Sequence, residues 1–251
     1  MGNRFDGKVV LVTGGNSGLG LETAKLFASE GARVVITGRR QQALDAAVAQ
    51  IGDGVLAIRA DSASLSDLDR MVDTIEQKAG RVDILFANAG LGKFAPLQQV
   101  TEEHYDKAFD VNVKGTLFTI QKVLRLMPDG SAIVVNASMV SVKGFPAFGV
   151  YAATKAALRS FVRTWSVDLK ERKIRVNAVS PGTIITPGYK DGLGLSDEQI
   201  ESMKSVTAQT APSGRVGVPL EVAKAVAFLA SDEASYVNGT ELFVDGGAAQ
   251  V

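Results

Sequence analysis

The sequence predicts an α/β fold in which a doubly wound parallel sheet has helices on both faces and residues 1–251 form a single domain. Segments typical of strands alternate with segments typical of helices along the whole chain. A glycine-rich turn joins the first expected strand to the first expected helix. No linker, internal repeat or low-complexity segment interrupts this alternation. A chain of 251 residues is long enough to bury a large core.

Short apolar runs rich in β-branched residues mark the expected strands. Such runs are typical of the strands of a parallel sheet, because both faces of that sheet are covered. The first run, residues 9–13, reads Val-Val-Leu-Val-Thr. In chain order the expected strands are residues 9–13, 34–37, 55–60, 83–87, 131–137, 175–179 and 241–244.

Segments with a helical pattern lie between these strands. The first helix is closed by Gly31, a residue type that often follows the end of a helix. The expected helices are residues 21–29, 42–51, 65–78, 101–127, 151–171 and 219–230. The order strand, glycine turn, helix, strand over residues 9–37 is the βαβ unit of a nucleotide-binding sheet, so we expect the fold to be Rossmann-like.

Residues 183–210 follow the sixth expected strand and show no regular pattern. They contain Gly188, Gly192 and Gly194. Long loops at this position often cover a binding site and move when the ligand enters. We therefore expect residues 183–210 to be an irregular insertion that covers the substrate.

The composition excludes several classes of function. Lysine and arginine together number 27, as do aspartate and glutamate, so no charge excess favours nucleic acid or an anionic membrane. The chain has no cysteine and one histidine, His104, which excludes thiol nucleophiles and histidine-rich metal sites. We expect no metal site. No apolar run reads as a signal peptide or reaches the length of a membrane span, so we expect a cytoplasmic protein.

The turn after the first strand contains Gly14, Gly18 and Gly20 in the spacing G-x-x-x-G-x-G. Glycines let the backbone approach a pyrophosphate closely, and the start of the next helix offers amide protons and a positive dipole end. The spacing differs from the usual G-x-G-x-x-G fingerprint. Its place between a strand and a helix nevertheless favours a dinucleotide site over a purely structural turn.

Glycine and polar residues follow the expected strands at their carboxyl ends. They include Gly38, Asp61, Asn88, Ser138 and Gly182, after the second to the sixth strand. Ligands of open α/β sheets bind beyond these ends. This shared position indicates one binding site more strongly than any single motif does.

The second strand is followed by Gly38, Arg39 and Arg40. In NAD-binding sheets an acidic residue near this position binds the ribose hydroxyls. Here no carboxylate is present to repel a 2′-phosphate, and a guanidinium group can bind one. We therefore expect NADP(H) as the cofactor in preference to NAD(H).

Tyr151 and Lys155 are four residues apart in an expected helix, so the phenol and the ammonium group lie on one face. A phenol titrates near ~10 in water, and a cation nearby lowers that pKa. We therefore expect Lys155 to lower the pKa of Tyr151 and to make it a general acid and base.

Together these residues resemble the short-chain dehydrogenase/reductase family over nearly the whole chain. The resemblance rests on Thr13-Gly14-x-x-x-Gly18-x-Gly20, Asn88-Ala89-Gly90, Asn112, Ser138, Tyr151-x-x-x-Lys155, Pro181-Gly182 and Val244-Asp245-Gly246-Gly247. Ser138 precedes Tyr151 by thirteen residues, as the family pattern requires. One departure is Ala87, where the family often has a further asparagine.

The resemblance implies the catalytic roles. Ser138 is expected to bind the substrate carbonyl oxygen, and Tyr151 to exchange a proton with it. Lys155 is expected to lower the tyrosine pKa and bind the nicotinamide ribose, while Asn112 stabilises a water that relays protons. The expected cofactor-binding residues are Gly14, Asn16, Ser17, Gly18, Leu19, Gly20, Gly38, Arg39, Arg40, Asp61, Ser62, Asn88, Ala89, Gly90, Tyr151, Lys155, Pro181, Gly182, Ile184 and Thr186.

The expected substrate pocket is apolar and aromatic. Its residues are Leu91, Phe94, Met139, Val140, Phe145, Phe148, Leu193 and Leu195. Such walls suit a hydrophobic and even bulky ketone or its secondary alcohol. A 3-oxoacyl thioester on a carrier protein, or a sugar or polyol, is the alternative substrate class. A cofactor-binding regulator without turnover is a further alternative, which the complete set of catalytic groups disfavours. The family resemblance also implies a homotetramer.

Overall fold

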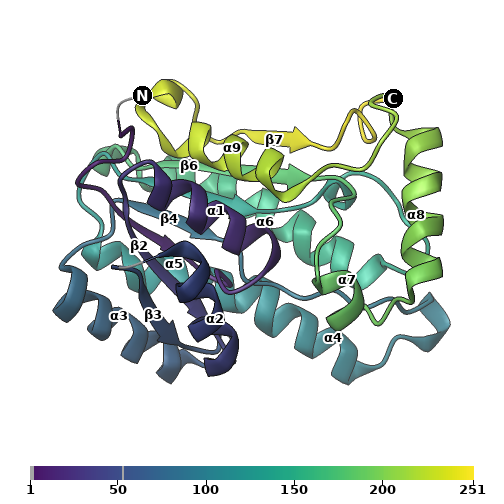
Figure 1. Cartoon of the computed structure of the whole chain (residues 1–251), viewed down its shortest axis with the longest axis horizontal. Coiled ribbons are helices and arrows are strands. Elements are labelled where there is room, and N and C mark those ends of the chain that lie inside the picture. Colours follow the sequence, from purple (N-terminus) through teal and green to yellow (C-terminus); the bar gives the residue numbers. More distant parts are fainter. Residues whose placement is uncertain (1–2, 53) are drawn as a thin grey trace.

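A seven-stranded parallel sheet lies at the centre of the molecule (Figure 1). The structure, a computed structural model, describes residues 3–52 and 54–251. The strand order is β3-β2-β1-β4-β5-β6-β7, so the winding direction reverses between β1 and β4. This order confirms the predicted doubly wound sheet. The strands are β1 (Val9–Val12), β2 (Arg33–Gly38), β3 (Leu56–Arg59), β4 (Ile84–Ala87), β5 (Ala132–Asn136), β6 (Arg175–Pro181) and β7 (Glu241–Val244).

Helices cover both faces of this sheet (Figure 1). The α-helices are α1 (Gly18–Ser29), α2 (Gln41–Ile51), α3 (Leu65–Ala79), α4 (Glu102–Phe109), α5 (Gly115–Val123), α6 (Gly149–Asp168), α7 (Gly188–Asp191), α8 (Asp197–Thr210) and α9 (Pro219–Ala230). The short 3₁₀ or π segments are η1 (Leu97–Gln99), η2 (Asp110–Lys114), η3 (Leu124–Leu126), η4 (Met139–Ser141), η5 (Lys170–Arg172) and η6 (Asp232–Ala234).

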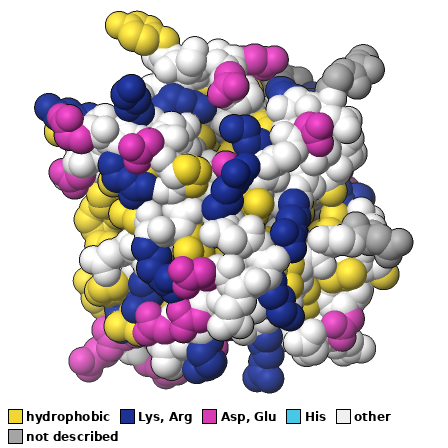
Figure 2. All heavy atoms as spheres, turned by 90° about the vertical axis from the view of Figure 1, so that its left-hand side faces the viewer, with side chains coloured by type: hydrophobic (Ala, Val, Ile, Leu, Met, Phe, Trp, Pro, Cys, Tyr) yellow, Lys and Arg dark blue, Asp and Glu magenta, His cyan; other side chains and the backbone are white. Residues whose placement is uncertain are grey.

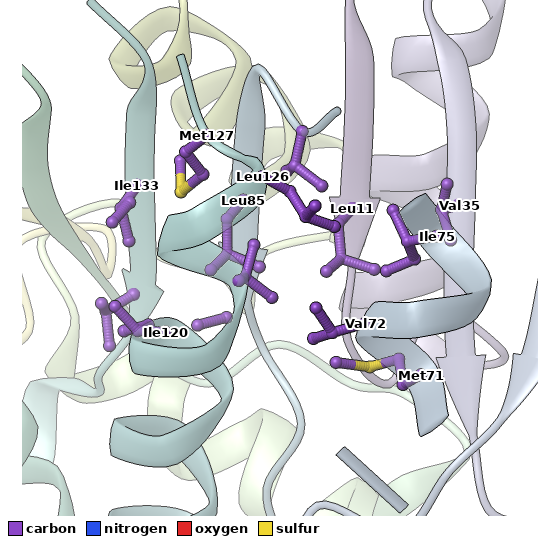
Figure 3. Packing of buried hydrophobic residues seen from close by; sticks show 14 of the residues in the cluster. Leu11, Val35, Met71, Val72, Ile75, Leu85, Ile120, Leu126, Met127 and Ile133 are labelled. Atoms are coloured by element: carbon purple, nitrogen blue, oxygen red, sulfur yellow. The ribbon is translucent and has the colours of Figure 1, made fainter. Parts of the chain in front are cut away.

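Alternate residues of each strand supply two separate cores. Leu11, Leu85 and Ile133 point to the face that α3, α5 and α6 cover, as the close view of that core shows (Figure 3). Val10 and Val12 point to the opposite face, which α1, α2 and α9 cover. Because side chains alternate between the faces of a strand, a sheet with two covered faces requires the continuous apolar runs seen in the sequence.

The helix expected over residues 101–127 is not continuous. It divides into α4, a π-helical turn over Asp110–Lys114, and α5, followed by a 3₁₀ turn at Leu124–Leu126. A π turn inserts one extra residue without breaking the helix, so the apolar pattern does not reveal it. The turn contains Asn112, whose side chain is fully buried.

The expectation of an irregular insertion at residues 183–210 is wrong in its secondary structure. This segment contains the short helix α7 and the helix α8 of 14 residues. Helix α8 begins with a capping box, in which Ser196 and Gln199 satisfy each other's backbone amides. That Ser-x-x-Gln signal is readable in the sequence. The remaining expected elements are present, with small shifts at their ends.

The carboxyl ends of the strands lie on the right in Figure 1, where α7 and α8 also lie. The opposite end of the molecule carries lysine and arginine interspersed with aspartate and glutamate (Figure 2). Within residues 3–52 and 54–251 no helix is both long and apolar enough to cross a membrane. The same residues contain no group of three histidine, aspartate or glutamate side chains arranged to hold a metal ion.

Gly115, the first residue of α5, generates a test of this packing. A Cβ atom there would lie 2.6 Å from the backbone oxygen of Ser62, at the turn after β3. Gly115 directly follows the π turn, so a shift of its backbone would also move Asp110–Lys114. Gly115→Ala is therefore expected to lower the free energy of unfolding by about 1–3 kcal/mol, although alanine is the better helix former.

Urea unfolding monitored by circular dichroism measures this change. Gly144→Ala is the matched control, because a Cβ atom at Gly144 meets nothing within 4 Å. The control should stay within about 0.5 kcal/mol of the parent. Equal stability of the two variants would contradict the packing described here.

Candidate active site

A cavity of about 580 Å³ lies beyond the carboxyl ends of the strands. The glycine turn after β1, the ends of β2 to β6 and the segment containing α7 and α8 all contribute to its wall. Most site residues predicted from the sequence line this one cavity: Gly14, Asn16, Ser17, Gly18, Leu19, Gly38, Arg39, Arg40, Asp61, Ser62, Asn88, Ala89, Gly90, Leu91, Phe94, Ser138, Met139, Val140, Phe145, Phe148, Tyr151, Lys155, Pro181, Gly182, Ile184, Thr186 and Leu193.

Three predicted site residues do not line the cavity. Gly20 lies beneath the glycine turn, where a Cβ atom would come within 2.6 Å of Asn88 Nδ2. Leu195 is half-buried, and its backbone amide donates to the carbonyl oxygen of Tyr189. Asn112 is fully buried behind the cavity wall. Each of these residues supports the site through packing or hydrogen bonds, which sequence spacing alone does not distinguish from direct contact.

Asn112 fixes the segment that follows β4. Its Oδ1 atom accepts from the backbone amide of Leu91 at 2.8 Å, and its Nδ2 atom donates to the Leu91 oxygen at 2.9 Å. Nδ2 also donates to Thr154 Oγ1 at 3.0 Å, and Thr154 in turn donates to the carbonyl oxygen of Tyr151 at 2.7 Å. The amide of Asn112 therefore ties the cavity wall at Leu91 to the first turns of α6.

Thr13 and Asn88 hold the glycine turn against the end of β4. The hydroxyl of Thr13 accepts from the backbone amides of Asn88 and Ala89, at 2.9 and 3.0 Å. The Nδ2 atom of Asn88 donates to the carbonyl oxygens of Thr13 and Gly14, at 2.9 and 3.3 Å. These bonds satisfy polar groups of the turn within the chain itself and tie the turn to the end of β4.

Lys155 is buried in the middle of the cavity wall. Its Nζ atom donates to the carbonyl oxygen of Asn136 at 2.7 Å, and the side-chain amide of Asn136 donates to Asn88 Oδ1 at 2.9 Å. The lysine is thus connected to the glycine turn through two asparagines. Burial lowers the pKa of Lys155 to about 8, because the charged form loses hydration.

Tyr151 lies one helical turn before Lys155 on the same face of α6. Lys155 Nζ lies 5.5 Å from the centre of the tyrosine ring. Burial raises the pKa of the Tyr151 phenol, the nearby phenol of Tyr189 raises it further, and the Ser138 hydroxyl opposes the rise. The predicted net lowering of the Tyr151 pKa is therefore wrong for this structure: loss of hydration dominates the shift, and Lys155 is not among its causes.

Ser138 follows β5 in an extended conformation and begins the 3₁₀ turn η4. Its Oγ atom accepts from the backbone amide of Val140 at 3.4 Å, which keeps the hydroxyl proton free for another acceptor. The serine hydroxyl and the Tyr151 phenol lie close enough for the serine to affect the tyrosine pKa. A carbonyl oxygen in the cavity can therefore meet two hydroxyl groups.

Aromatic rings form the wall of the cavity beside Tyr151. The Phe148 ring stacks on the Tyr151 ring at 4.4 Å between centroids, and the Phe94 ring stacks on Phe148 at 4.5 Å. Phe145 lies 6.4 Å from Phe148 at an edge-on angle. The predicted aromatic residues thus form one continuous apolar surface that ends at the phenol.

The segment containing α7 and α8 closes over this surface. A Cβ atom on Gly92 would lie 3.1 Å from Phe148 and 3.3 Å from Leu193, so both side chains lie close to the glycine. Tyr189 and Met203 also line the cavity, although sequence reasoning did not single them out. Both are in the segment that was expected to be irregular, where the capping box was the only available signal.

The residues at the other end of the cavity fit a dinucleotide. Gly14 and Gly18 have φ angles of +64° and +52°, which side-chain-bearing residues rarely adopt. A Cβ atom on Gly14 would also approach Asn88 Nδ2 to 3.1 Å. The buried Asn136 Oδ1 atom has no hydrogen-bond partner in the described part of the chain, so it remains available to a donor on a ligand.

The buried ammonium group generates a prediction about stability and pH. The pKa of Lys155 is about 8 in the folded chain and near ~10.4 in the unfolded chain. Between these values the unfolded chain binds more protons, so the free energy of unfolding should rise with pH. Above pH ~10 the raised pKa of Tyr151 acts in the opposite direction.

Urea unfolding of the parent and of Lys155→Met at several pH values between 8 and 10 gives the free energy of unfolding of each protein. The parent should gain about 1–2 kcal/mol of unfolding free energy relative to the variant over this range. Parallel pH profiles for the two proteins would show that the folded lysine titrates normally.

Comparisons with known proteins agree with this geometry. A family model described as enoyl-(acyl carrier protein) reductase matches residues 14–249. Oxidoreductase asL5 of Sarocladium schorii is 42% identical over 250 residues, which cover 99% of this chain and 98% of that protein.

Two solved structures cover the chain equally well. Levodione reductase superposes with a TM-score of 0.91 at 34% identity, covering 99% of this chain and 100% of the other. A short-chain dehydrogenase/reductase family protein superposes with a TM-score of 0.88 at 41% identity, with the same coverage of 99% and 100%. The chain therefore belongs to the short-chain dehydrogenase/reductase family, whose members are oxidoreductases that use a nicotinamide dinucleotide.

Proposed function

We propose that this protein is an NADP(H)-dependent oxidoreductase that interconverts a hydrophobic ketone and its secondary alcohol. The observation that carries the proposal is the position of Tyr151. Its phenol lies where the aromatic surface of the cavity meets the polar end, beside Ser138 and one turn from Lys155. A ketone bound on the aromatic surface can present its oxygen to both hydroxyl groups.

The chain's own residues supply proton transfer and orientation. When bound, the dinucleotide donates or accepts the hydride. Ser138 binds the carbonyl oxygen, and Tyr151 donates a proton to that oxygen during reduction and removes it during oxidation. The phenol of Tyr151 is protonated at neutral pH, because its pKa is raised, and this is the form that donates the proton in reduction. Lys155 lies beside the polar end of the cavity, where its ammonium group can bind the nicotinamide ribose.

The glycine turn and the ends of the strands are proposed to hold the dinucleotide. Asn16, Ser17 and Leu19 contact phosphates or ribose, and Asp61 and Ser62 contact the adenine. Asn88, Ala89 and Gly90 line the channel, while Pro181, Gly182, Ile184 and Thr186 lie at the nicotinamide end. The water relay assigned to Asn112 remains a prediction, because the hydrogen bonds of its side chain go to Leu91 and Thr154.

The substrate preference follows from the cavity wall. Phe94, Phe148 and Leu193 present apolar surface, and Tyr189 adds one phenol near Tyr151. Such a surface favours a hydrophobic, bulky carbonyl compound over a sugar or polyol, whose hydroxyl groups need several hydrogen-bond partners. The likeness to levodione reductase supports a small-molecule ketone. The family model is described by an enoyl group on an acyl carrier protein, so it favours a carrier-linked substrate. A 3-oxoacyl thioester is the carrier-linked substrate that has a ketone group for Ser138 and Tyr151 to bind.

The preference for NADP(H) rests on the end of β2. Gly38 is followed by Arg39 and Arg40, and both arginines are exposed at the cavity. A Cβ atom on Gly38 would lie 2.6 Å from Asn16 Oδ1, so this position cannot hold an acidic side chain without moving Asn16. A guanidinium group beside the ribose can bind a 2′-phosphate. The site also lacks the carboxylate that binds the ribose hydroxyls of NAD(H) in other sheets of this kind.

We further propose a cytoplasmic homotetramer that binds neither nucleic acid nor membrane. Tyr105 of α4 stacks on Phe109 with about half of its surface exposed, and Val167 at the end of α6 is 64% exposed. Exposed apolar side chains on these two helices support association between copies of the chain.

A substrate panel with a Tyr151→Phe variant tests the reaction. NADPH oxidation is expected with hydrophobic cyclic or aryl ketones and diketones, and to be weaker with 3-oxoacyl thioesters and sugars. Tyr151→Phe should lower kcat/KM by at least about 100-fold, because it removes the proton donor. NADPH binding, measured by fluorescence, should be retained.

Tyr105→Phe is the matched control, since that phenol is on the exposed stacked pair outside the cavity. Near-parental turnover by Tyr151→Phe would overturn the mechanism. Turnover of 3-oxoacyl thioesters without any turnover of simple ketones would favour the alternative substrate class. NADPH binding without turnover of any compound would favour a regulatory role.

An Arg39→Asp variant tests the cofactor. Replacing the guanidinium by a carboxylate should reduce kcat/KM for NADPH by about 10- to 100-fold, the loss expected for a charged hydrogen bond. The value for NADH should stay constant or rise. Arg59→Asp makes the same charge change at the end of β3, outside the cavity, and should leave both values unchanged. A parent that uses NADH as well as NADPH would refute the assignment.

A further inference from the structure

Glu241 of β7 lies behind the cavity wall and makes three polar contacts through one carboxylate. Its Oε1 atom accepts from Ser141 Oγ at 2.7 Å and from Ser180 Oγ at 2.6 Å. Its Oε2 atom lies 3.1 Å from Arg159 Nε. The glutamate side chain is only 7% exposed, and that of Arg159 is 19% exposed. A buried carboxylate is stable only when such partners replace its lost hydration.

Each of the three partners belongs to a segment that carries part of the active site. Ser141 ends the 3₁₀ turn that begins at Ser138, and its amide donates to the Ser138 oxygen at 2.9 Å. Ser180 is followed directly by Pro181 and Gly182 at the nicotinamide end of the cavity.

Arg159 connects the glutamate to the catalytic helix. It is on α6 at the position four residues after Lys155 and eight after Tyr151, so the three share one helix face. Arg159 also donates through Nη1 to the carbonyl oxygen of Gly239 at 3.0 Å, just before β7. The guanidinium group therefore fixes the helix face against the strand that carries Glu241.

The backbone register of the sheet explains how one side chain reaches these segments. Glu241 is paired with Ala178 in the β6–β7 ladder. Ser180 is two residues further along β6 and points to the same face, toward α6 and η4. Glu241 does not line the cavity, so it touches no ligand there.

We propose that Glu241 is a positioning residue, which sets the distance between Ser138 and Tyr151 by tying η4, α6 and the end of β6 to one carboxylate. This inference rests on the proposed roles of Ser138 and Tyr151. Two hydroxyl groups that share one carbonyl oxygen must be placed to within a fraction of an ångström, and small errors there reduce turnover strongly. The carboxylate supplies this placement because its contacts are charged, buried and directional.

The test uses Ser141→Ala, which removes one contact and leaves the ion pair intact. With the best ketone of the panel, Ser141→Ala should lower kcat about tenfold. The fluorescence-measured Kd for NADPH should stay within about twofold, because the glycine turn is untouched. The melting temperature should change by no more than about 4 °C, the shift for loss of one hydrogen bond. Ser141→Thr keeps the hydroxyl and should restore turnover.

Hydrogen exchange provides a readout that does not depend on turnover. The amides of Ser141, Val142 and Lys143 donate to the oxygens of Ser138 and Met139 within the turn. In Ser141→Ala these amides should exchange faster than in the parent, while the amides of β1 and β4 exchange at parental rates. Glu241→Gln should show the same local change and a larger loss of kcat.

Glu30→Gln is the matched control, because Glu30 also forms an ion pair, with Arg4 at 2.7 Å, far from η4 in the fold. It should keep parental kcat and parental exchange in the turn. If Glu241→Gln does not fold, Ser141→Ala decides alone. Parental kcat together with parental exchange in Ser141→Ala would overturn the positioning role, as would an equal loss of kcat in Glu30→Gln.

The two proposals fail in different ways. If the parent turns over no ketone, or Tyr151→Phe remains active, the proposed function is wrong, whatever the exchange rates are. If the parent is active, Tyr151→Phe is inactive, and Ser141→Ala matches the parent in both readouts, only the role of Glu241 is wrong.

Discussion

The hydrogen bond from Lys155 Nζ to the carbonyl oxygen of Asn136 is the interaction on which the site depends. It gives a buried ammonium group a backbone acceptor at 2.7 Å, at the residue where β5 ends. The same asparagine donates to Asn88, which holds the glycine turn. One chain of hydrogen bonds thus runs from the glycine turn at one end of the cavity to Lys155 on α6.

Burial then divides the cavity into two chemical environments. At one end, backbone amides, asparagines and exposed arginines offer polar contacts to a charged dinucleotide. At the other end, stacked aromatic rings form an apolar surface, and the same burial raises the pKa of Tyr151 and lowers that of Lys155. Both shifts favour neutral groups, which is the state expected when water is largely excluded. Tyr151 lies at the boundary between these two environments, where the proposed reaction requires proton transfer.

The sequence predicted the fold and most of the residues that line the cavity, because both follow from the positions of residues along parallel strands. Residues after each strand must meet at one edge of the sheet, and nearly all of them do. The prediction for residues 183–210 was wrong because it rested on Gly188, Gly192 and Gly194 alone, whereas a capping box of Ser196 and Gln199 begins α8. Tyr189 and Met203 were missed for the same reason, since only a folded segment brings them over the cavity.

Contacts between distant segments were beyond sequence reasoning. Asn112 matched a motif, but its bonds to Leu91 and Thr154 depend on a π turn that no apolar pattern reveals. Glu241 carried no signal at all, because its partners Ser141, Arg159 and Ser180 come from three other elements.

The sequence by itself determined the parallel sheet, the glycine turn and the pair of groups four residues apart on one helix, because short-range periodicity and backbone geometry specify these features. Only the tertiary structure decided the pKa shifts of Tyr151 and Lys155 and the position of α7 and α8 over the aromatic surface. The same holds for the contacts of the Glu241 carboxylate with three other segments. These features depend on which groups exclude water from one another, and that is a property of the packed molecule rather than of any segment.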